Sequence, residues 1–412
     1  MESMPPQSAS TQCCIAGGGP AGVMLGYILA RAGIDVMVLE KHDDFFRDFR
    51  GDTIHPSTFT VMQELGLLDA FLKVKHDELH DLSGRIGGVE LKLVNFQFIP
   101  GPCKFLGFMP QWDFLSFLAE QGRRLSTFRL EMKTEATDLL FEGDTVVGVR
   151  AQSPSGPLEI RAPLVVAADG RDSRLRQRAG MQPRDYGVPI DVLWMRISRK
   201  ESDRSAAFGN IAPGGILVTI NRGSYYQCAF VIRKGGFDDI KQRGIDYLRQ
   251  RIVDLAPYLA DRVHELKSFD DVSLLTVTVN RLPVWARPGL LFIGDAAHAM
   301  SPVGGVGINL AIQDAVATAN LLAGPLRNRS LRMSDLNAVQ RRREFPTKII
   351  QGIQLTIQNR IMTSVLNTSQ HFNPPLILRI LDRVSLLRNI PAYIVGIGPR
   401  PEHVRCLSPR VD

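Results

Sequence analysis

Cysteine is scarce in this 412-residue sequence, and the cysteines that occur form no recognisable pair or cluster. There are five, none of them spaced as Cys-x-x-Cys. The neighbours Cys13 and Cys14 fall on an expected strand, where adjacent side chains point to opposite faces and cannot bridge each other. This pattern excludes a disulfide framework and a dithiol redox pair, and it predicts no metal site. We expect a reducing, cytoplasmic location.

Long apolar runs are lacking too. No stretch holds the roughly 18 uncharged apolar residues of a membrane span, and residues 1–10 lack the positive start and apolar centre of a signal peptide. We therefore expect no membrane span. Residues 376–397 form an amphipathic stretch with Arg379, Arg383 and Arg388. We expect it to cap the domain, and peripheral contact with an anionic bilayer is the alternative.

Clustered basic charge is missing as well, although the formal net charge is +7. The densest run, Arg341-Arg342-Arg343, falls in an expected helix, and we interpret it as a solvated helix face. The sequence therefore predicts no nucleic-acid partner. What the chain does have is a globular composition, 44% hydrophobic and 22% charged, in a length sufficient for two or three layers around a core.

The apolar pattern near the start predicts a βαβ unit. A strand over 13–16 is followed by a glycine-rich turn, a helix over 21–32 and a strand over 35–39. The short apolar runs 164–168 and 290–293 are typical of strands buried on both faces of a parallel sheet. We expect all four strands in one doubly wound α/β sheet.

Residues from about 186 to 285 show a different pattern. Alternating β-rich runs over 216–221, 225–233 and 274–279, with a helix near 238–255, predict an antiparallel sheet inserted into the first domain. After Asn309 the pattern is helical almost to the end, with breaks expected at Pro346 and at Pro374-Pro375. The expected ranges are 11–185 and 286–330 for the first domain, 186–285 for the inserted sheet and 331–412 for a C-terminal helical region.

The turn after the first strand carries a dinucleotide-binding pattern. It reads Gly17-Gly18-Gly19-Pro20-Ala21-Gly22 and satisfies G-x-G-x-x-G. Glycines there allow a tight turn and let backbone amides reach a pyrophosphate at the start of the helix. Glu40 ends the next strand, about 20 residues on, where a carboxylate can accept hydrogen bonds from an adenosine ribose.

A second loop distinguishes flavin from nicotinamide. The run Gly294-Asp295-Ala296-Ala297-His298 places a carboxylate at the end of a buried strand, and residues 301–309 lead from there into a helix. Amides at a helix start carry partial positive charge, which would stabilise the negative charge of a reduced flavin ring. Nicotinamide has no comparable need, so the loop predicts a flavin.

With these motifs the chain resembles the aromatic hydroxylases of the p-hydroxybenzoate hydroxylase and ubiquinone-biosynthesis hydroxylase superfamily. The matching motifs are the glycine turn, Asp169-Gly170 and Gly294-Asp295, in the same order and spacing, and they span residues 13 to about 322. The resemblance implies a Rossmann-like FAD-binding domain with three-layer ββα architecture and an inserted β-sheet substrate domain. It also implies a single-component monooxygenase that uses FAD, NADPH or NADH and O2 to hydroxylate an aromatic ring through a C4a-hydroperoxyflavin.

The resemblance also assigns cofactor contacts. Asp295 would hold the ribityl chain, and Ile308 and Asn309 would offer main-chain amides to the flavin. The full expected set is Gly17, Gly19, Pro20, Ala21, Gly22, Glu40, Lys41, Arg50, Gln111, Ala136, Asp169, Gly170, Asp295, Pro302, Gly307, Ile308 and Asn309.

Two histidines lie near these motifs. His55 falls on a loop that in the family runs near the flavin, and we consider it as a catalytic base for a substrate hydroxyl. His298 follows Gly294-Asp295, and we interpret it as a packed, hydrogen-bonded structural residue.

Only one dinucleotide fingerprint is present, so a disulfide reductase with a second nucleotide domain is excluded and the nicotinamide donor must bind transiently. A flavin-dependent reductase or halogenase on the same fold is the alternative, although the W-x-W-x-x-P signature of tryptophan halogenases is missing. The protein is expected to be a monomer or a homodimer.

The substrate wall is expected on the inserted sheet, at Thr219, Asn221 and Tyr225. Laid on p-hydroxybenzoate hydroxylase, Asn221 falls where that enzyme has the arginine that binds the benzoate carboxylate. An asparagine cannot supply a bidentate cation, so we expect a largely hydrophobic phenol, quinolone or polyketide-like ring in preference to a benzoate. Arg222 should face away from the side of Asn221, unless a bulge near Gly223 turns it inward.

Overall fold

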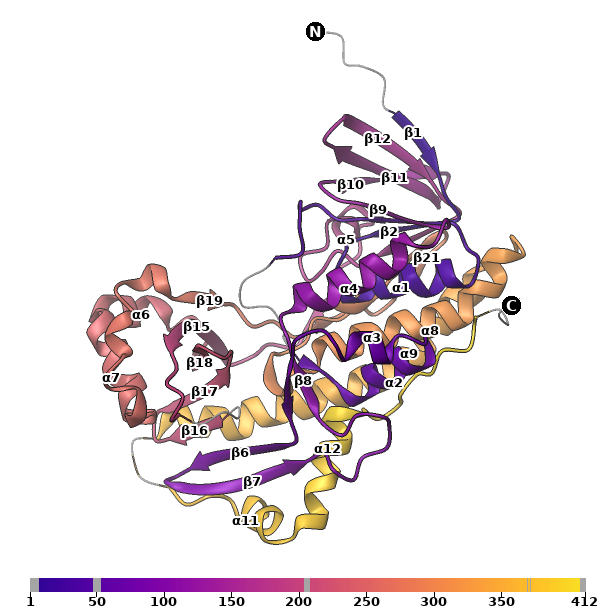
Figure 1. Cartoon of the computed structure of the whole chain (residues 1–412). Helices are drawn as coiled ribbons and strands as arrows, with labels where there is room; N and C mark the ends of the chain where they lie inside the picture. The colour runs from indigo at the N-terminus through magenta and orange to yellow at the C-terminus, as the bar shows by residue number, and fades with distance from the viewer. Residues whose placement is uncertain (1–6, 47–52, 204–207, 369, 371, 408–412) are drawn as a thin grey trace.

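A parallel sheet lies at the centre of the computed structural model, which describes residues 7–46, 53–203, 208–368, 370 and 372–407 (Figure 1). Its strand order is β21 (Ala286–Arg287), β22 (Leu290–Phe292), β13 (Leu164–Ala167), β2 (Cys13–Ala16), β3 (Val36–Leu39) and β9 (Phe128–Glu131). All neighbours are parallel except the edge pair β21 and β22. Because the carboxyl ends of β2, β13 and β22 are in register, the loops that follow them meet at one edge of the sheet.

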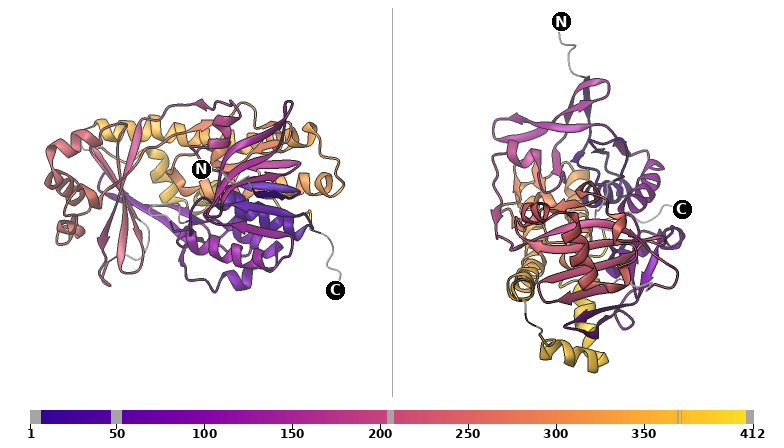
Figure 2. Two further views of the ribbon diagram at one scale, coloured as in Figure 1. Left: turned by 90° about the horizontal axis from the view of Figure 1, so that it is seen from above. Right: turned by 90° about the vertical axis from the view of Figure 1, so that its left-hand side faces the viewer.

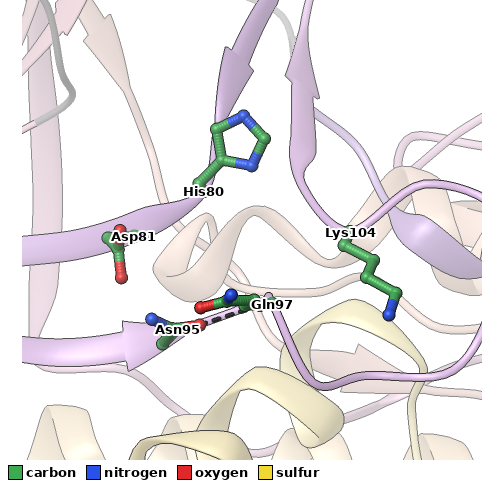
Figure 3. Close-up of a pocket in the computed structure, with 5 residues that line it drawn as sticks. All are labelled: His80, Asp81, Asn95, Gln97 and Lys104. Atoms are coloured by element: carbon green, nitrogen blue, oxygen red, sulfur yellow. Dashed lines mark hydrogen bonds between the residues drawn. The ribbon is translucent and has the colours of Figure 1, made fainter.

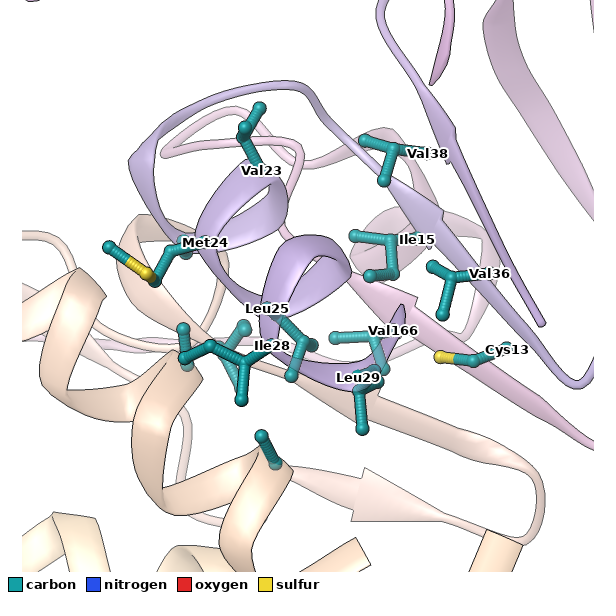
Figure 4. Packing of buried hydrophobic residues seen from close by; sticks show 14 of the residues in the cluster. Cys13, Ile15, Val23, Met24, Leu25, Ile28, Leu29, Val36, Val38 and Val166 are labelled. Carbon is teal, nitrogen blue, oxygen red and sulfur yellow. The ribbon is translucent and has the colours of Figure 1, made fainter. Parts of the chain in front are cut away.

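The first βαβ unit forms as its sequence predicts. Helix α1 (Pro20–Arg31) begins with proline at its first position, which suits the fixed φ of that residue, and it follows β2 directly after the glycine turn. Its apolar side chains pack on the buried side chains of β2 and β3 (Figure 4). The expected helix and second strand, 21–32 and 35–39, differ from the observed bounds by one residue.

The central sheet is covered on both faces. One side carries a smaller sheet, β1 (Gln7–Ser10), β12 (Gly156–Arg161), β11 (Thr145–Ser153) and β10 (Glu135–Glu142), and the other side carries helices α1, α4 (Gln111–Arg123) and α8 (Gly307–Arg327) (Figure 1). This confirms the expected three-layer ββα architecture. Among the described helices one segment, Val303–Arg327, has the length and apolar composition of a membrane span, and 78% of its most apolar window is buried inside the fold.

The inserted sheet has seven strands. Their order is β19 (Ser273–Leu275), β15 (Ile190–Ser198), β18 (Tyr225–Arg233), β17 (Gly215–Asn221), β16 (Phe208–Ala212), β6 (Asp81–Ile86) and β7 (Val89–Asn95). Helices α6 (Phe237–Arg243) and α7 (Ile245–Leu255) cover its outer face, and its other face is turned towards the rest of the molecule (Figures 1 and 2).

This sheet corrects the expected range 186–285 and its purely antiparallel character. Strands β6 and β7 come from the first part of the chain, and β6 pairs with β16 in parallel. The sequence did not reveal them because they alternate weakly and much of β7 is exposed, so their sheet partner depends on a contact across more than 100 residues.

Two helix predictions also need correction. The helix expected over 238–255 is divided at Gly244, whose φ of +87° ends α6 before α7 begins. Helix α9 (Met333–Thr356) continues through Pro346, where a break was expected. Its packing on the core through Leu336, Val339 and Ile350 outweighs the one hydrogen bond that proline removes.

The break at Pro374-Pro375 is confirmed, because α11 (Leu376–Arg383) begins directly after it. Between α9 and this break lie the π-helix η6 (Ile357–Met362) and α10 (Thr363–Asn367). After α11 the chain forms η7 (Ser385–Arg388) and α12 (Asn389–Gly396). The remaining elements are β4 (Thr53–Ile54), α2 (Pro56–Glu64), α3 (Leu68–Phe71), β5 (Asp77–Leu79), β8 (Leu106–Phe108), α5 (Arg174–Arg178), β14 (Arg184–Asp185), η1 (Pro257–Leu259), η2 (Val263–Glu265), η3 (Phe269–Asp271), β20 (Asn280–Arg281), η4 (Gly294–Ala296) and η5 (Val303–Gly305).

Candidate active site

The glycine turn fits tightly between two strand ends. Gly17 has a φ of +109°, and a Cβ there would lie 2.3 Å from the Ala168 carbonyl oxygen at the end of the neighbouring strand. A Cβ on Gly22 would lie 1.9 Å from the Gly17 oxygen. Glycine is therefore required at both positions. No side chain caps α1, so its first amides face the turn and can bind an anion.

Glu40 closes this turn from the next strand. Its side chain is buried and accepts hydrogen bonds from the amides of Gly18, at 3.0 Å, and His42, at 3.1 Å. Three other expected contacts lie around it. Lys41 follows it and is exposed, Gln111 begins α4, and Ala136 lies on β10 just after Thr134, whose amide donates to the Glu40 carbonyl. Arg50 lies outside the described residues.

Asp169-Gly170 and Gly294-Asp295 lie beside the glycine turn. Asp169 accepts a hydrogen bond from the Leu175 amide through Oδ2, while its Oδ1 is buried with no partner among the described residues. Burial raises the pKa of the Asp169 carboxyl. Asp295 pairs with Arg171 at 3.4 Å, and both are about 30% exposed. Gly294 approaches Ala21 of α1, so the three motifs form one site.

The loop 302–307 connects this edge to α8 and has an unusual backbone. Gly304 and Gly305 both have positive φ, +82° and +64°, and a Cβ on Gly305 would lie 2.8 Å from Thr53 Oγ1. Thr53 in turn donates to the Gly305 carbonyl. Pro302, Gly307 and Ile308 are half-buried, whereas Asn309 is buried and accepts hydrogen bonds from Ser57 and Thr58 of α2.

Three glutamines on one face of α9 and η6 hold the same loop, and the sequence analysis missed them. Gln354 Nε2 donates to the carbonyls of Ser301 and Val303, at 3.0 and 2.8 Å, and its Oε1 accepts from the Ser301 amide. Gln351 Nε2 donates to the Ala299 carbonyl, and Gln358 to the Ser301 hydroxyl. All three are buried. Their spacing of three and four residues, typical of one helix face, was a readable signal.

A buried carboxylate, Asp314 of α8, orders the start of the Gly294-Asp295 motif. It accepts hydrogen bonds from His298 Nε2 at 2.6 Å, Arg343 Nε at 2.9 Å and the Gly294 amide at 3.1 Å. Burial alone would raise the pKa of Asp314, but His298 and Arg343 together hold it below its ordinary value. His298 is thus packed and hydrogen-bonded, as expected.

The same network corrects our interpretation of the basic run on α9. Arg343 is 1% exposed and also pairs with Glu402 at 3.3 Å, while its neighbour Arg342 pairs with Glu402 at 2.6 Å. Arg342 and Arg343 therefore do not belong to a solvated helix face, whereas Arg341 is exposed as expected. Their partners come from α8 and from the C-terminal segment, which sequence spacing cannot reveal.

His55 is fully buried between two main-chain carbonyls. Its Nδ1 lies 2.8 Å from the Val395 oxygen at the end of α12, and its Nε2 lies 3.0 Å from the Gly305 oxygen. Burial lowers the pKa of His55, an effect that the two carbonyls oppose. Carbonyl oxygens only accept, so the neutral ring donates its one N–H to one of them and turns its other nitrogen to the second carbonyl. This geometry does not favour the catalytic role, and it makes His55 a link between α12 and the loop 302–307.

Two of the three expected substrate residues face away from this loop. Thr219 is buried on the outer face of the inserted sheet, where its hydroxyl lies 3.1 Å from the Tyr258 hydroxyl beneath α7. Asn221 is two residues further along β17, on the same face, and accepts a hydrogen bond from the Gly223 amide within the turn to β18. Neither direction supports a substrate contact.

The inner face of the sheet carries different residues. Tyr225 lies on it and packs against Arg196, whose guanidinium is 5.3 Å from the ring centre. Arg222 turns to the same side, donates to Gln227 at 3.0 Å and lies 5.8 Å from the centre of the Phe108 ring. Phe108 pairs with Thr53, the residue that holds Gly305. Three contacts, through Phe108 and Thr53, thus connect Arg222 to the loop 302–307.

The whole-chain comparisons agree with this site. The model of one protein family, described as an FAD binding domain, matches residues 10–352. The chain belongs to this family. A 6-methylpretetramide 4-monooxygenase from Streptomyces rimosus is 33% identical over 394 residues, which are 94% of this chain and 91% of the relative.

Solved structures share the fold. PqsL, a probable FAD-dependent monooxygenase from Pseudomonas aeruginosa, superposes with a TM-score of 0.73 at 20% identity, covering 87% of this chain and 97% of its own. The flavin-dependent brominase Bmp2 reaches 0.75 at 15% identity, covering 94% of each chain. At such identities these two structures show the fold alone. The family and the Streptomyces relative establish that the protein is an FAD-dependent monooxygenase.

The residues of this family member fit FAD. The turn has no room for a side chain at Gly17 or Gly22 and leaves the first amides of α1 open for a pyrophosphate. Asp169 offers a buried oxygen without a donor. The loop 302–307 and the start of α8 present amides that favour negative charge on a reduced ring.

A separate hollow of about 310 Å³ lies near the end of β7 (Figure 3). It is lined by His80, Asp81, Asn95, Gln97 and Lys104, and the main-chain amide of Gln97 donates to the Asn95 side chain within it.

Proposed function

We propose that this monooxygenase hydroxylates a polycyclic, polyketide-like ring that carries an acidic phenol or enol oxygen, with NADPH or NADH as transient hydride donor. The observation that carries the proposal is the direction of Arg222. It places a cation on the inner face of the inserted sheet, where the sequence analysis had expected the neutral Asn221.

Part of this face is apolar and partly open. Val218 of β17, Val303 of the cofactor loop and Met362 of η6 are half-buried in one cluster. The other members of this cluster on β17 and β18 are buried against α10: Ile216, Ala229 and Val231. An apolar ring system can displace water from such a wall, and the single acidic oxygen can meet Arg222 at one end. The Streptomyces relative, named for a 6-methylpretetramide substrate, supports a polycyclic ring.

Bound FAD would supply the redox chemistry, taking up hydride from the nicotinamide donor and activating O2. The chain's own residues would do three things. Amides of the loop 302–307 stabilise negative charge, the apolar sheet excludes water from the reacting atoms, and Arg222 holds the substrate oxygen in its ionised, electron-rich form.

The test compares ring substrates on the native enzyme and on two neighbouring variants. NAD(P)H oxidation, O2 uptake and a mass gain of one oxygen would be measured for polycyclic phenols, their methyl ethers and 4-hydroxybenzoate. We expect Arg222→Gln to raise KM for ionised polycyclic phenols by roughly tenfold or more, because a charge-assisted hydrogen bond is worth about 1.5–3 kcal/mol.

Asn221→Ala is the matched control, because Asn221, the last residue of β17, has its side chain on the outer face, whereas the neighbouring Arg222 turns to the inner face. It should leave KM nearly unchanged. Equal effects of the two substitutions would show that the strand faces are misassigned. If the methyl ethers were turned over at the same rate as the phenols, the role of Arg222 would be excluded. If 4-hydroxybenzoate alone were turned over, the polycyclic substrate class would be overturned.

We also propose a reducing cytoplasmic location, since all five cysteines are free of disulfides and four of them are buried. We propose further that the protein is a monomer or a homodimer. Light scattering on the FAD-loaded protein distinguishes the two.

A further inference from the structure

The segment formed by α11 and η7 projects beyond β7 at the rim of the molecule (Figures 1 and 2). No residue of either element is buried. Six large aliphatic side chains of this segment and of α12 are exposed, with Leu386 at 72% and Leu376 at 71%. We call this set the apolar edge: Leu376, Ile377, Ile380, Val384, Leu386 and Ile390.

The exposure of the apolar edge is built into the way α11 is held. Its opposite side faces β7, where Asp382 accepts a hydrogen bond from the Lys92 amide at 2.9 Å. Arg388 donates to the carbonyls of Leu381 and Asp382, which fixes η7 against the end of α11. Polar contacts thus fasten the helix from one side and leave the apolar residues Leu376, Ile380 and Val384, spaced by four, on the other.

Residues 376–397 were expected to cap the domain, and only the last part of this stretch, α12, packs on the core. In α12, Ala392 and Gly396 are buried, and Gly396 packs against Pro56 and Phe96. The function of α12 therefore differs from that of α11 and η7, which lie along β7 without burying any residue of their own. A helix whose apolar side faces solvent requires an occupant of that side.

Charge identifies the occupant. Arg379 and Arg383 are exposed beside the apolar edge, and the one acidic residue of 376–397, Asp382, is turned to β7. Apolar side chains bordered by arginines match the boundary between acyl chains and anionic headgroups. A second copy fits poorly, since two-fold pairing of this edge would bring like-charged arginines together.

The geometry points to a docking surface: the apolar edge binds the protein peripherally to an anionic lipid bilayer. The apolar side chains enter the headgroup region, and Arg379 and Arg383 contact lipid phosphates. Helix α12 connects this surface to the interior: Ala392 and, just after the helix, Ile397 share a cluster with Phe108, over which Arg222 lies.

The test is sedimentation of the full-length, FAD-loaded protein with vesicles. One set contains phosphatidylcholine alone, and the other contains phosphatidylcholine and phosphatidylglycerol in equal parts. We expect binding to the anionic set that weakens as salt is added. The double variant Ile377→Asn with Leu386→Asn should lower the partition coefficient roughly tenfold or more, because it removes two large apolar contacts.

Two further variants separate the contributions. Arg379→Gln with Arg383→Gln should remove the preference for anionic vesicles. Phe345→Asn is the control, since Phe345 is a comparably exposed apolar residue, 55% exposed, on α9. It should bind as the native protein does. All variants should keep FAD absorbance and turnover of a water-soluble phenol, which separates this proposal from the substrate proposal.

Three outcomes would overturn the inference. The first is no sedimentation with anionic vesicles. The second is an equal loss of binding in Phe345→Asn, which would indicate non-specific adsorption. The third is a native dimer, seen by light scattering, that dissociates in the Ile377→Asn, Leu386→Asn variant, which would make a second copy the occupant.

Discussion

Asp314 illustrates how one buried charge orders a cofactor loop. Three donors converge on it from His298, Arg343 and the Gly294 amide, and it touches no expected ligand position itself. A buried carboxylate is tolerated only when its lone pairs are satisfied, so losing any donor affects the fold before it affects chemistry. Substitution of a residue at the cofactor surface should instead weaken FAD binding and leave the fold intact.

We expect Asp295→Ala and His298→Ala to separate these two roles. Asp295 is part-exposed, so its removal should keep the fold and weaken FAD binding by about 1.5–3 kcal/mol for each charge-assisted hydrogen bond lost. His298→Ala should instead lower the free energy of unfolding by about 1–3 kcal/mol, because it removes a donor from buried Asp314. FAD release by ultrafiltration and urea unfolding measure the two effects.

The ranking is the test of this assignment. Asp295→Ala should lose more FAD than His298→Ala at a temperature where both are folded. A larger FAD loss in His298→Ala would mean that the end of β22 has been misassigned.

His55 predicts a pH dependence of stability. Because its folded pKa lies below the ordinary 6.5, the unfolded chain binds the proton more strongly. The stabilisation is therefore complete above about pH 6.5 and is lost as the pH falls below that value. We expect the urea concentration at the unfolding midpoint of the native protein to be lower at about pH 5.5 than at about pH 8.

The variant His55→Gln keeps a hydrogen-bond donor but cannot titrate, so part of this pH dependence should disappear. It should also keep measurable turnover, because His55 acts as a link and not as a base. A variant that folds, binds FAD and has no turnover at any pH would restore the catalytic role.

At the scale of elements, the face of helix α9 and η6 that carries Gln351, Gln354 and Gln358 acts as a clamp on the loop 302–307 and the residues before it. The loop has two glycines with positive φ and would lose entropy on ordering. Hydrogen bonds from a rigid helix supply that order. The glutamines thus pre-organise amides that must face the cofactor.

Gln354→Ala should weaken FAD binding roughly tenfold, because three hydrogen bonds to the loop are lost and buried carbonyls are left unpaired at about 1–3 kcal/mol. Asn359→Ala, an exposed neighbour on η6, is the control and should bind FAD as the native protein does. Titration of the apoprotein with FAD, followed by flavin fluorescence, measures both. Identical dissociation constants would exclude the clamp.

The limits of sequence reasoning are clear at this scale. Cys13–Ala16 and Tyr225–Arg233 were predicted with their observed bounds, because apolar periodicity and turn residues are local signals. Period-two alternation also separated Asn221 from Arg222 correctly. It could not say which face of β17 meets the cofactor loop, since that depends on where α7 packs.

For the whole molecule, motifs were more informative than patterns. The glycine turn, Glu40 and Asp295 were found because each follows a buried strand, and parallel strands bring their ends together. The clamp, the Arg343 network and the joining of β6 to β16 were missed. The last two depend on contacts between segments far apart in the chain, for which a single sequence has no signal, whereas the spacing of the clamp glutamines was a signal that could have been used.

The pairing of β6 with β16 affects how this protein is made. Strands β6 and β7 leave the ribosome as a two-stranded hairpin, and β16 follows about 120 residues later, or roughly 6–25 seconds at ordinary rates of synthesis. An isolated hairpin is marginally stable at best in water, and its free edge can pair with another chain. Newly made protein should therefore be most prone to aggregation in this interval, and slower translation of residues 96–207 would lengthen it.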